Sequence, residues 1–320
     1  MKDARDNERS TARLAASEID RRGFLKCMQW VGAGLIWTLE GGIPTSRLLG
    51  APRKKTQAGD FTFVQISDSH IGFNGAANAD VRETFQVAVD KVNSLEKQPE
   101  FILHTGDLTH LAQADQFDTL DQLLRGFQQK QVFFVPGEHD LLGDHGARYL
   151  ERFGKGTSGR GWHSFDHKGV HFIGLNNSAQ LDGLGAIGDE QLAWLRNDVS
   201  GLAASTPIVV FAHIPLWAVY PQWGWDTKDS AQALDLLKRF GSLTVLNGHI
   251  HQTLQKIEGS VTFYSAMSTA FPQPAPGTAA SAGPMKVPAD QLRKVLGIRD
   301  VNFVAGQHNL AVVDSTLSGV

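Results

Sequence analysis

Cysteine is nearly absent from this chain. Cys27 is the only one among 320 residues, so no intramolecular disulfide can form and no cluster of thiolates can bind a metal. Any metal site must therefore use histidine and carboxylate ligands, and the 12 histidines make such a site feasible. The formal net charge of -3 supplies no basic field for the phosphates of nucleic acid, and we expect no stable nucleic-acid binding.

The sequence also lacks an apolar run of the ~20 residues that a membrane-spanning helix needs. A mildly apolar stretch follows Arg22 and reaches Leu39, but Lys26 and Gln29 interrupt it. The adjacent Arg21 and Arg22, followed by Phe-Leu-Lys, resemble a bacterial twin-arginine export signal, which the twin-arginine translocation machinery reads. This resemblance predicts a periplasmic or secreted protein. The alternative is a basic amphipathic helix at the N-terminus.

Two segments follow from this interpretation. We assign residues 1–59 to the export signal and a linker, because residues 50–59 (GAPRKKTQAG) have the composition of a linker. Cleavage near Ala51 is one possibility. Residues 60–320 are long enough to form one domain with a sizeable core, and we expect a single domain there.

Strand and helix patterns alternate in the first half of residues 60–320. Runs rich in β-branched and aromatic residues predict strands at 61–67, 101–105 and 131–135. Apolar residues at helical spacing predict helices over 79–97 and 113–129. Strands that alternate with helices of this length are typical of crossover connections and a largely parallel sheet.

Hairpins become more frequent in the second half. Two strands are predicted within 162–176 with a turn at Lys168-Gly169, and two more within 253–266 with a turn at residues 258–260. Strands at 207–213 and 242–251 each run into a histidine, a helix covers 188–202, and residues 271–289 form a long loop. Paired strands are predicted within 302–314. This order fits two sheets packed together with helices outside.

Side chains able to bind a metal follow five of the predicted strands. Such loops lie at one edge in sheets built from β-α-β units, so residues far apart in the sequence converge there. A single histidine or Gly-Asp at a strand end is usually structural, but five fragments at five strand ends point to one site. The residues are Asp68, His70, Asp107, Glu138, His139, His213, His249 and His251.

These fragments resemble the motifs of the calcineurin-like metallophosphoesterases. The family pattern is Asp-x-His, Gly-Asp, Gly-Asn-His-Asp/Glu, a later His, and Gly-His-x-His. Here it occurs in the same order, within residues 61–265, as Asp68-Ser69-His70, Gly106-Asp107, Gly137-Glu138-His139-Asp140, His213 and Gly248-His249-Ile250-His251. The resemblance implies an α/β fold, a four-layer α/β/β/α sandwich of two mixed sheets flanked by helices.

The resemblance also implies the ligands of two metal ions. One ion is expected to bind Asp68, His70, Asp107 and His251, and the other is expected to share Asp107. The ligands of this second ion would be Asp107, Glu138, His213 and His249. A mixture of imidazole and carboxylate suits manganese, iron or zinc better than magnesium or calcium.

The implied reaction is hydrolysis of a small phosphorylated substrate, in which a metal-activated hydroxide attacks a phosphodiester or phosphomonoester. His139 carries over as the residue that supports the transition state or protonates the leaving alkoxide. Asp140 is a candidate to orient the imidazole of His139. The alternative is that Asp140 only caps the following helix.

Glu138 departs from the family pattern, which has Asn at this position. An ionised Glu binds a metal more strongly than Asn but donates no hydrogen bond and adds a negative charge. We therefore expect a phosphoesterase that slightly prefers diesters. The alternative function is a metal-holding binding protein of the same fold, with little or no turnover because Glu138 replaces the Asn.

Aromatic residues are concentrated just after His213. They either stack on an aromatic part of the substrate or pack their own loop onto the domain, and packing is the favoured interpretation. The residues are Trp217, Tyr220, Trp223 and Trp225.

Overall fold

The computed structural model describes residues 34–40, 43–49, 59–307 and 310–319. The chain divides into two compact units, Met1–Thr56 and Gln57–Val320. In the first unit, β1 (Gly34–Glu40) pairs antiparallel with β2 (Ile43–Leu49). Arg21, Arg22 and Cys27 lie outside the described residues. Among the residues that are described, no helix is both long and apolar enough to cross a membrane.

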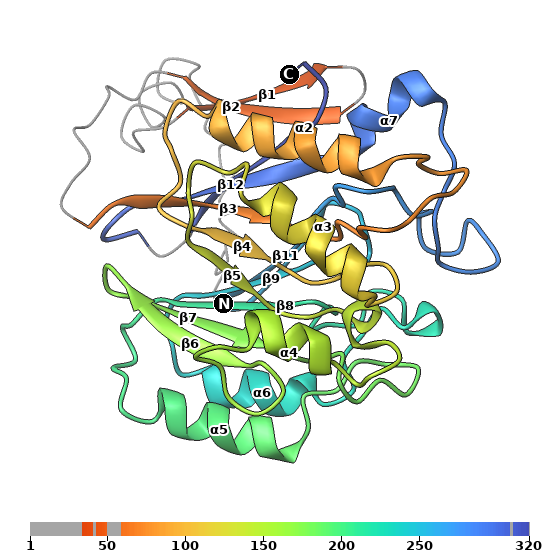
Figure 1. The fold of residues 1–320 in the computed structure, drawn as a ribbon. Helices are drawn as coiled ribbons and strands as arrows, with labels where there is room; N and C mark the ends of the chain where they lie inside the picture. The colour runs from red at the N-terminus through yellow and green to blue at the C-terminus, as the bar shows by residue number, and fades with distance from the viewer. Residues whose placement is uncertain (1–33, 41–42, 50–58, 308–309, 320) are drawn as a thin grey trace, which may run out of the picture. The chain divides into compact units, whose positions relative to one another are not determined.

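The second unit contains a sheet of five strands and a sheet of six strands, both mixed (Figure 1). The smaller sheet has the order β13 (Ala311–Thr316), β12 (Gly297–Phe303), β3 (Phe61–Ile66), β4 (Ile102–His104) and β5 (Val132–Phe134). Strands β3, β4 and β5 are parallel, whereas β12 is antiparallel to both its neighbours.

The larger sheet has three parallel pairs at its centre and an antiparallel hairpin at each edge. Its order is β10 (Leu254–Glu258), β11 (Val261–Ser265), β9 (Leu243–Asn247), β8 (Ile208–Ala212), β7 (Val170–Leu175) and β6 (His163–His167). The predicted turn at Lys168-Gly169 is confirmed, since both residues have positive φ, 46° and 84°.

Helices cover the outer face of each sheet. They are α2 (Val81–Asn93), α3 (Ala114–Leu124), α4 (Ala147–Phe153), α5 (Asp189–Val199), α6 (Ser230–Leu237) and α7 (Ala289–Val295). Helix α2 starts at Val81, two residues after the predicted start, because Asp80 is its N-cap and the Asp80 side chain accepts from the Arg82 amide. It ends at Asn93, four residues before the predicted end, with Ser94 as its C-cap.

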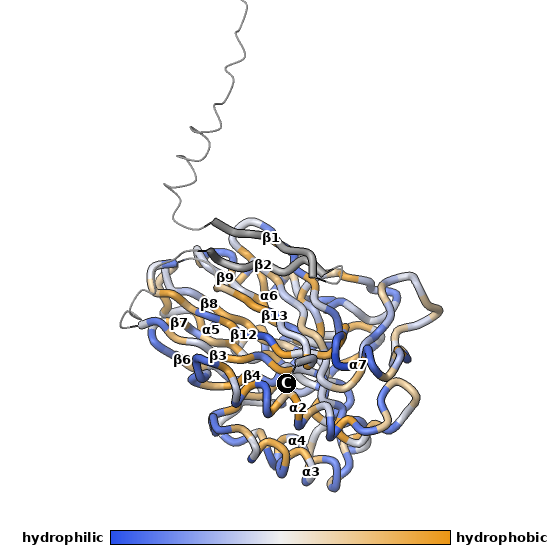
Figure 2. Tube along the Cα trace, turned by 90° about the horizontal axis from the view of Figure 1, so that it is seen from above, coloured by the Kyte–Doolittle hydropathy of each residue, from blue (hydrophilic) through white to orange (hydrophobic). Residues whose placement is uncertain are grey.

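Three hydrophobic layers hold the sandwich together. Successive side chains of a strand point to opposite faces, so Val64 and Ile66 of β3 pack with Phe85 of α2. The alternate residues of β3, Phe61 and Phe63, belong to the layer between the two sheets. A third layer lies between the larger sheet and helices α5 and α6. The predicted four-layer α/β/β/α architecture is confirmed, and Figure 2 shows hydrophobic stretches along β8 and β9.

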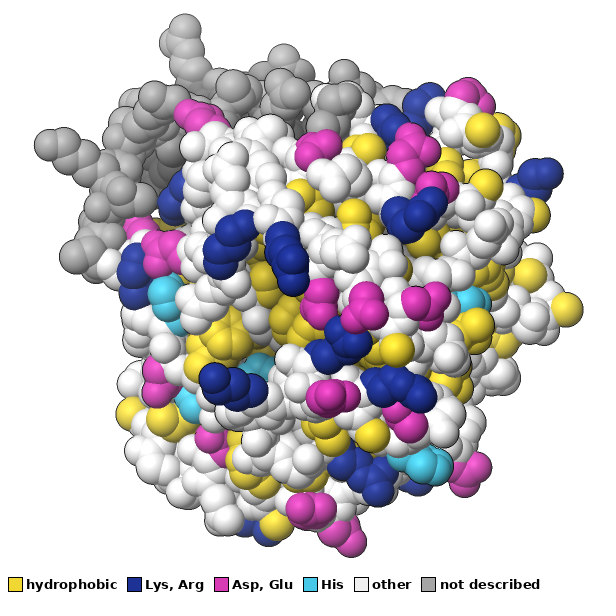
Figure 3. Space-filling view, viewed as in Figure 1, with side chains coloured by type: hydrophobic (Ala, Val, Ile, Leu, Met, Phe, Trp, Pro, Cys, Tyr) yellow, Lys and Arg dark blue, Asp and Glu magenta, His cyan; other side chains and the backbone are white. Residues whose placement is uncertain are grey.

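Exposed charges of opposite sign are interspersed on the surface. Figure 3 shows Lys and Arg side chains close to Asp and Glu side chains on the face seen in Figure 1. Arg152, for example, pairs with Asp118 at 2.8 Å and with Asp121 at 2.9 Å. Exposed pairs of this kind contribute little stability each, and here they leave no extended single-sign patch on this face.

A buried histidine predicts one pH-dependent component of stability. His171 on β7 contacts Asp166 at 2.8 Å and Asp198 at 2.9 Å. Burial lowers its pKa, but the two carboxylates outweigh burial and raise the pKa above the usual value. The folded state therefore holds this proton more tightly than the unfolded state, so the stabilisation is full at acidic pH and disappears as pH rises through the raised pKa.

We expect His171→Gln to lower the free energy of unfolding by about 1.5 kcal/mol at pH 5.5, a typical value for hydrogen bonds to charged groups. The difference from wild type is expected to shrink as pH rises above the raised pKa. Urea unfolding of metal-free protein at several pH values measures it. A difference that is constant across this range would contradict the assignment.

Candidate dinuclear metal centre

The predicted ligands lie where the carboxyl ends of both parallel strand sets meet. Asp68 and His70 follow β3, Asp107 follows β4, and Glu138 begins η1 (Glu138–Leu141), the 3-10 turn that follows β5. His213 follows β8, and the pair His249 and His251 follows β9. Backbone bonds join these loops, from Asp68 N to Gly106 O at 3.0 Å and from Gly248 N to His213 O at 3.0 Å.

One cluster consists of Asp68, His70 and His251, all buried, with potential ligand atoms within 4.8 Å of one another. His251 Nε2 lies 3.2 Å from Asp68 Oδ1 and 3.2 Å from His70 Nε2. The three atoms therefore face a common point, as the sequence predicts for the first ion.

A second cluster consists of Glu138, His213 and His249. Glu138 Oε2 lies 3.1 Å from His213 Nε2, and Glu138 Oε1 lies 3.1 Å from His249 Nδ1. The two imidazole nitrogens are 3.3 Å apart. Glu138 therefore faces the second cluster, which is where the resemblance places the ligand of the second ion.

Asp107 lies between the two clusters. Its Oδ2 is 3.5 Å from His70 Nε2 in the first cluster and 3.3 Å from His213 Nε2 in the second. Its other oxygen, Oδ1, accepts from the His139 amide at 3.0 Å. The structure thus brings all seven predicted ligands together, with Asp107 in the position of a shared ligand.

Backbone carbonyls orient two of the imidazoles. His213 Nδ1 donates to Thr105 O at 2.8 Å, and His251 Nδ1 donates to Phe271 O at 2.6 Å. With Nδ1 protonated, Nε2 of each ring is left as the ligand atom. The ring of Phe271 also stacks on His70, with centroids 4.7 Å apart. Sequence reasoning missed Phe271, because nothing in its local sequence marks a residue that supports a ligand.

Five of the seven ligands have a strained backbone. Positive φ values are uncommon outside glycine and are concentrated at functional sites. These five are most of the described non-glycine residues with positive φ. Their backbone is therefore in an unfavourable conformation, and this conformation directs their side chains toward the two clusters. They are Asp68 (53°), His70 (40°), Asp107 (51°), His249 (66°) and His251 (54°).

Glycines allow the loops to approach this closely. A Cβ on Gly137 would lie 2.0 Å from Asp107 Oδ1, and one on Gly248 would lie 2.4 Å from Asp68 Oδ2. Both distances are far below contact, so any side chain at these positions must displace a ligand.

We expect Gly137→Ala to weaken metal binding about tenfold or more, because the methyl group pushes the shared ligand Asp107 out of place. Metal titration monitored by calorimetry measures the change. Gly201→Ala is the matched control, because a Cβ at Gly201 meets nothing within 4 Å. Equal metal affinity in both variants would contradict the packing argument.

The electrostatics of the site favour a cation. Burial raises the pKa of Asp68, but His251 and His213 lower it to about 2, and the carboxylate is ionised. Burial lowers the pKa of His213, whereas Asp107 and Glu138 raise it well above the usual value. Among the described residues, Asp68, Asp107 and Glu138 form ion pairs with histidines but none with Lys or Arg, so a bound cation would balance the negative charge that the histidines leave.

The donor atoms of the second cluster lead to the same conclusion. Glu138 Oε2 is buried and has only the contact of 3.1 Å with His213 Nε2, and His249 Nδ1 lies 3.1 Å from Glu138 Oε1. Nitrogen and oxygen donors of this kind, together with three carboxylates, suit transition-metal ions. The residues present therefore fit a pair of metal ions.

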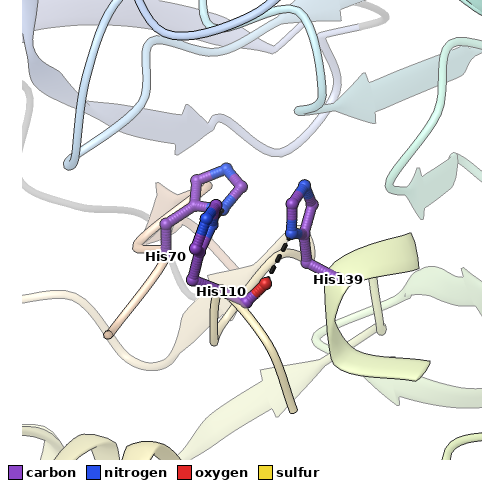
Figure 4. Close-up of side chains that lie close together, drawn as sticks. All are labelled: His70, His110 and His139. Carbon is purple, nitrogen blue, oxygen red and sulfur yellow. Dashed lines mark hydrogen bonds between the residues drawn. The ribbon is translucent and has the colours of Figure 1, made fainter. Parts of the chain in front are cut away.

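A third histidine cluster lies beside the first (Figure 4). His139 Nδ1 donates to His110 O at 2.6 Å, and the two rings stack with centroids 4.8 Å apart. His110 Nδ1 lies 3.4 Å from His70 Nδ1. These contacts fix the ring of His139 next to the metal ligands, so that its other nitrogen is the one left to meet a substrate.

The expectation that Asp140 orients the imidazole of His139 is corrected. The Asp140 carboxylate accepts from the amides of Leu108 at 3.0 Å, Thr109 at 2.8 Å and Gly137 at 3.0 Å, and it makes no described contact with the His139 ring. By accepting from Gly137 N it caps η1, the 3-10 turn to which it belongs. It does not cap the following helix, as the alternative expected, because the N-cap of α4 is Gly146. Asp140 therefore joins the Asp107 loop to the Glu138 turn.

The aromatic residues after His213 pack their own loop. Trp225 is fully buried, and its ring lies edge-on to Trp223 at 5.1 Å, which in turn contacts Tyr220 at 5.1 Å. These contacts agree with the favoured interpretation, in which the aromatic residues pack their own loop onto the domain.

Comparison with known proteins agrees with this geometry. The sequence profile of the calcineurin-like phosphoesterases matches residues 61–253. A serine/threonine-protein phosphatase CPPED1 of Danio rerio is 29% identical over 227 residues, covering 62% of this chain and 72% of that protein. A 3′,5′-cyclic-nucleotide phosphodiesterase of Nostoc is 24% identical, covering 66% of this chain and 79% of that protein.

Among solved structures, GAP50, described as the anchor in the inner membrane complex of Plasmodium, superposes with a TM-score of 0.53. It is 14% identical, and the match covers 81% of this chain and 85% of that chain. At this identity the likeness concerns the fold alone.

The two-sheet sandwich and its buried ligand clusters define a dimetal phosphoesterase. The chain belongs to the calcineurin-like phosphoesterase family, because the family profile matches more than half of its length. Metal-dependent hydrolysis of phosphate esters is the activity of this class.

Proposed function

We propose that this protein hydrolyses phosphodiesters in preference to phosphomonoesters. The observation that supports the proposal is Glu138, whose two carboxylate oxygens lie 3.1 Å from His213 and 3.1 Å from His249. This is the position at which the resemblance expects a neutral Asn. The named relatives include both a phosphatase and a phosphodiesterase, so the preference has to come from this chain's own residues.

The proposed ligands are those that the two clusters contain. Asp68, His70 and His251 hold one ion, Glu138, His213 and His249 hold the other, and Asp107 is shared. When bound, two such ions supply an activated nucleophile and bind the phosphate oxygens. The imidazole and carboxylate donors favour manganese, iron or zinc.

The charge balance explains the preference for diesters. Two divalent ions bring four positive charges. Asp68, Asp107 and Glu138 cancel three of these charges, whereas a chain with Asn at position 138 would cancel only two. The loss of one positive charge weakens the binding of any phosphate ester. A dianionic monoester loses about twice as much attraction as a monoanionic diester, because the interaction scales with the product of the charges.

His139 is the proposed group that supports the transition state or protonates the leaving alkoxide. Burial lowers its pKa, but Asp107 and Glu138 raise it, and the net shift is upward. Its Nδ1 is occupied by His110 O, which leaves Nε2 for the substrate. Asp140 positions this machinery through the backbone of Gly137 and Thr109.

The experiment compares substrates on protein loaded separately with manganese, zinc and iron. Bis(p-nitrophenyl) phosphate is expected to have a higher kcat/KM than p-nitrophenyl phosphate, with two ions bound per chain by elemental analysis. Protein treated with a chelator is the control and is expected to be inactive. Two bound ions with no hydrolysis of mono-, di- or pyrophosphate esters would instead support the alternative, a metal-holding protein without turnover.

We also propose that residues 1–59 are an export signal and linker, that residues 60–320 are the phosphoesterase domain, and that the protein reaches the periplasm or exterior through the twin-arginine machinery. The support is the Arg21-Arg22 pair before a weakly apolar stretch. Replacement of both arginines by lysine is expected to retain the protein in the cytoplasm, as measured by cell fractionation. Unchanged export in that variant would contradict the proposal.

A further inference from the structure

A pocket of about 250 Å³ opens beside the second cluster. Its walls come from η1 and the loop after it on one side, and from the loop after β7 on the other. The lining residues are Glu138, Leu141, Leu142, His145, Ser178, Ala179 and Leu181.

Glu138 connects this pocket to the metal centre. The same side chain that faces His213 and His249 at 3.1 Å also lines the pocket. A group attached to a phosphate held at the two clusters therefore has this pocket within reach, past the Glu138 carboxylate.

Exposed leucines form the apolar part of the pocket. Leu142 is 43% exposed and Leu181 is 45% exposed, and they are two of the six large hydrophobic side chains that are exposed in the described part of the chain. Leu141 adds a third apolar wall. Burial of such surface against an apolar ligand is favourable, so the pocket favours a hydrocarbon or aromatic group.

One polar group in the pocket lacks a partner. Ser178 is only 4% exposed, and its Oγ is buried without a hydrogen bond. The backbone of Ser178 is held in place, because Ser178 N donates to Asn176 Oδ1 at 3.0 Å. A buried hydroxyl of this kind is normally paired, and a ligand with one hydrogen-bonding atom satisfies it once the Ser178 side chain turns toward the pocket.

The charge of the pocket disfavours a second anionic group. None of its lining residues, all of which the structure describes, is Lys or Arg, Glu138 contributes a carboxylate, and His145 is the one lining residue that can take up a proton to become positive. Pyrophosphates and other substrates with a second phosphate would meet repulsion here instead of a counter-charge.

We propose that this pocket binds an uncharged substituent of the phosphoester: one ring, or a branched alkyl group of similar size, with a single hydrogen-bonding atom. The proposal rests on the proposed function, because the phosphate of the same substrate has to lie at the metal centre. It narrows the substrate class to esters of aryl, cyclic or branched alkyl alcohols. Leu142, Leu181 and Ser178 are then the specificity-determining residues.

The test measures binding, so that it does not depend on turnover. Phenylphosphonate and methylphosphonate are not hydrolysed and carry the same charge at a pH at which both are dianions, and calorimetry at that pH on the full chain loaded with manganese gives their affinities. Phenylphosphonate is expected to bind about tenfold more tightly, since its ring buries apolar surface in the pocket.

Two variants and a control test whether the tighter binding of phenylphosphonate comes from this pocket. Leu181→Asp is expected to bring the phenyl-to-methyl affinity ratio close to one. Ile257→Asp, at a 68% exposed position on β10 away from the pocket, is the matched control and is expected to keep the wild-type ratio. Ser178→Ala is expected to remove the extra affinity of the best hydroxyphenylphosphonate isomer over phenylphosphonate.

The outcomes separate this proposal from the proposed function. Equal affinities for the two phosphonates in the wild type, or an equal loss of the ratio in Leu181→Asp and Ile257→Asp, would overturn the pocket proposal and leave diester hydrolysis standing. Failure of a protein with two bound ions to bind either phosphonate would overturn the phosphate site itself, and the pocket proposal with it.

Discussion

Replacement of Asp107 by Asn is expected to lower kcat/KM for bis(p-nitrophenyl) phosphate by about 10³-fold or more. Loss of a residue that merely supports a metal ligand costs roughly 10–100-fold, and Asp107 is a direct ligand shared by both proposed ions. Its Oδ2 lies 3.5 Å from His70 and 3.3 Å from His213, so a neutral amide there weakens both clusters at once. Elemental analysis is expected to show loss of both ions.

Two further variants make the prediction sharper. His251→Asn removes a residue of the first cluster only, and His249→Asn removes a residue of the second only. Each is expected to retain about one ion, in contrast to Asp107→Asn. Asp300→Asn on β12 is the control, because Asp300 is a partly buried carboxylate outside the metal centre. Full retention of two ions by Asp107→Asn would refute the shared-ligand assignment.

Replacement of Glu138 by Asn is expected to raise hydrolysis of both ester types and to shift the preference toward monoesters. The substitution removes one negative charge next to His213 and His249, and the attraction for a dianionic monoester increases more than that for a diester. We expect a rise of about three- to tenfold in kcat/KM for the diester and a larger rise for p-nitrophenyl phosphate. Weaker retention of the second ion is expected at the same time, because a carboxylate ligand is lost.

Glu138→Gln is the matched comparison, since it removes the charge and keeps the length of the side chain. A similar shift in both variants assigns the effect to charge, whereas a shift in Glu138→Asn alone assigns it to ligand geometry. Metal titration and the ratio of kcat/KM for the two substrates are the measurements. Unchanged rates and metal content in Glu138→Asn would show that Glu138 has no part in the site.

Much of the fold was predictable because the hydrophobic patterns are local. Strand β3 and helix α2 lie within the ranges expected from alternating and helical spacing. Three short helices, α4, α6 and α7, were not predicted, because seven or eight residues give too few turns for a clear period. Tertiary contacts stabilise such short helices more than their own sequence does.

The site was predictable to the level of residue identity. Side chains at the ends of parallel strands converge whatever the details of the loops, so Asp68, Asp107 and His213 could be placed together in advance. Contacts made across loops could not be anticipated. Asp140 is adjacent to His139 in sequence but accepts from the backbone amides of Leu108 and Thr109, which are 32 and 31 residues away.

The sequence by itself therefore determined that two sheets pack together with helices outside, which side chains can bind metal, and that Glu138 is among them, because these follow from local hydrophobic patterns and residue types. The four-layer α/β/β/α architecture was implied by the resemblance to the family. Only the tertiary structure decided which oxygens of Asp107 and Glu138 face which histidines, and that Leu181 and Ser178 form a pocket beside them. Those relations depend on how loops from two sheets pack against each other, over distances for which a linear pattern carries no signal.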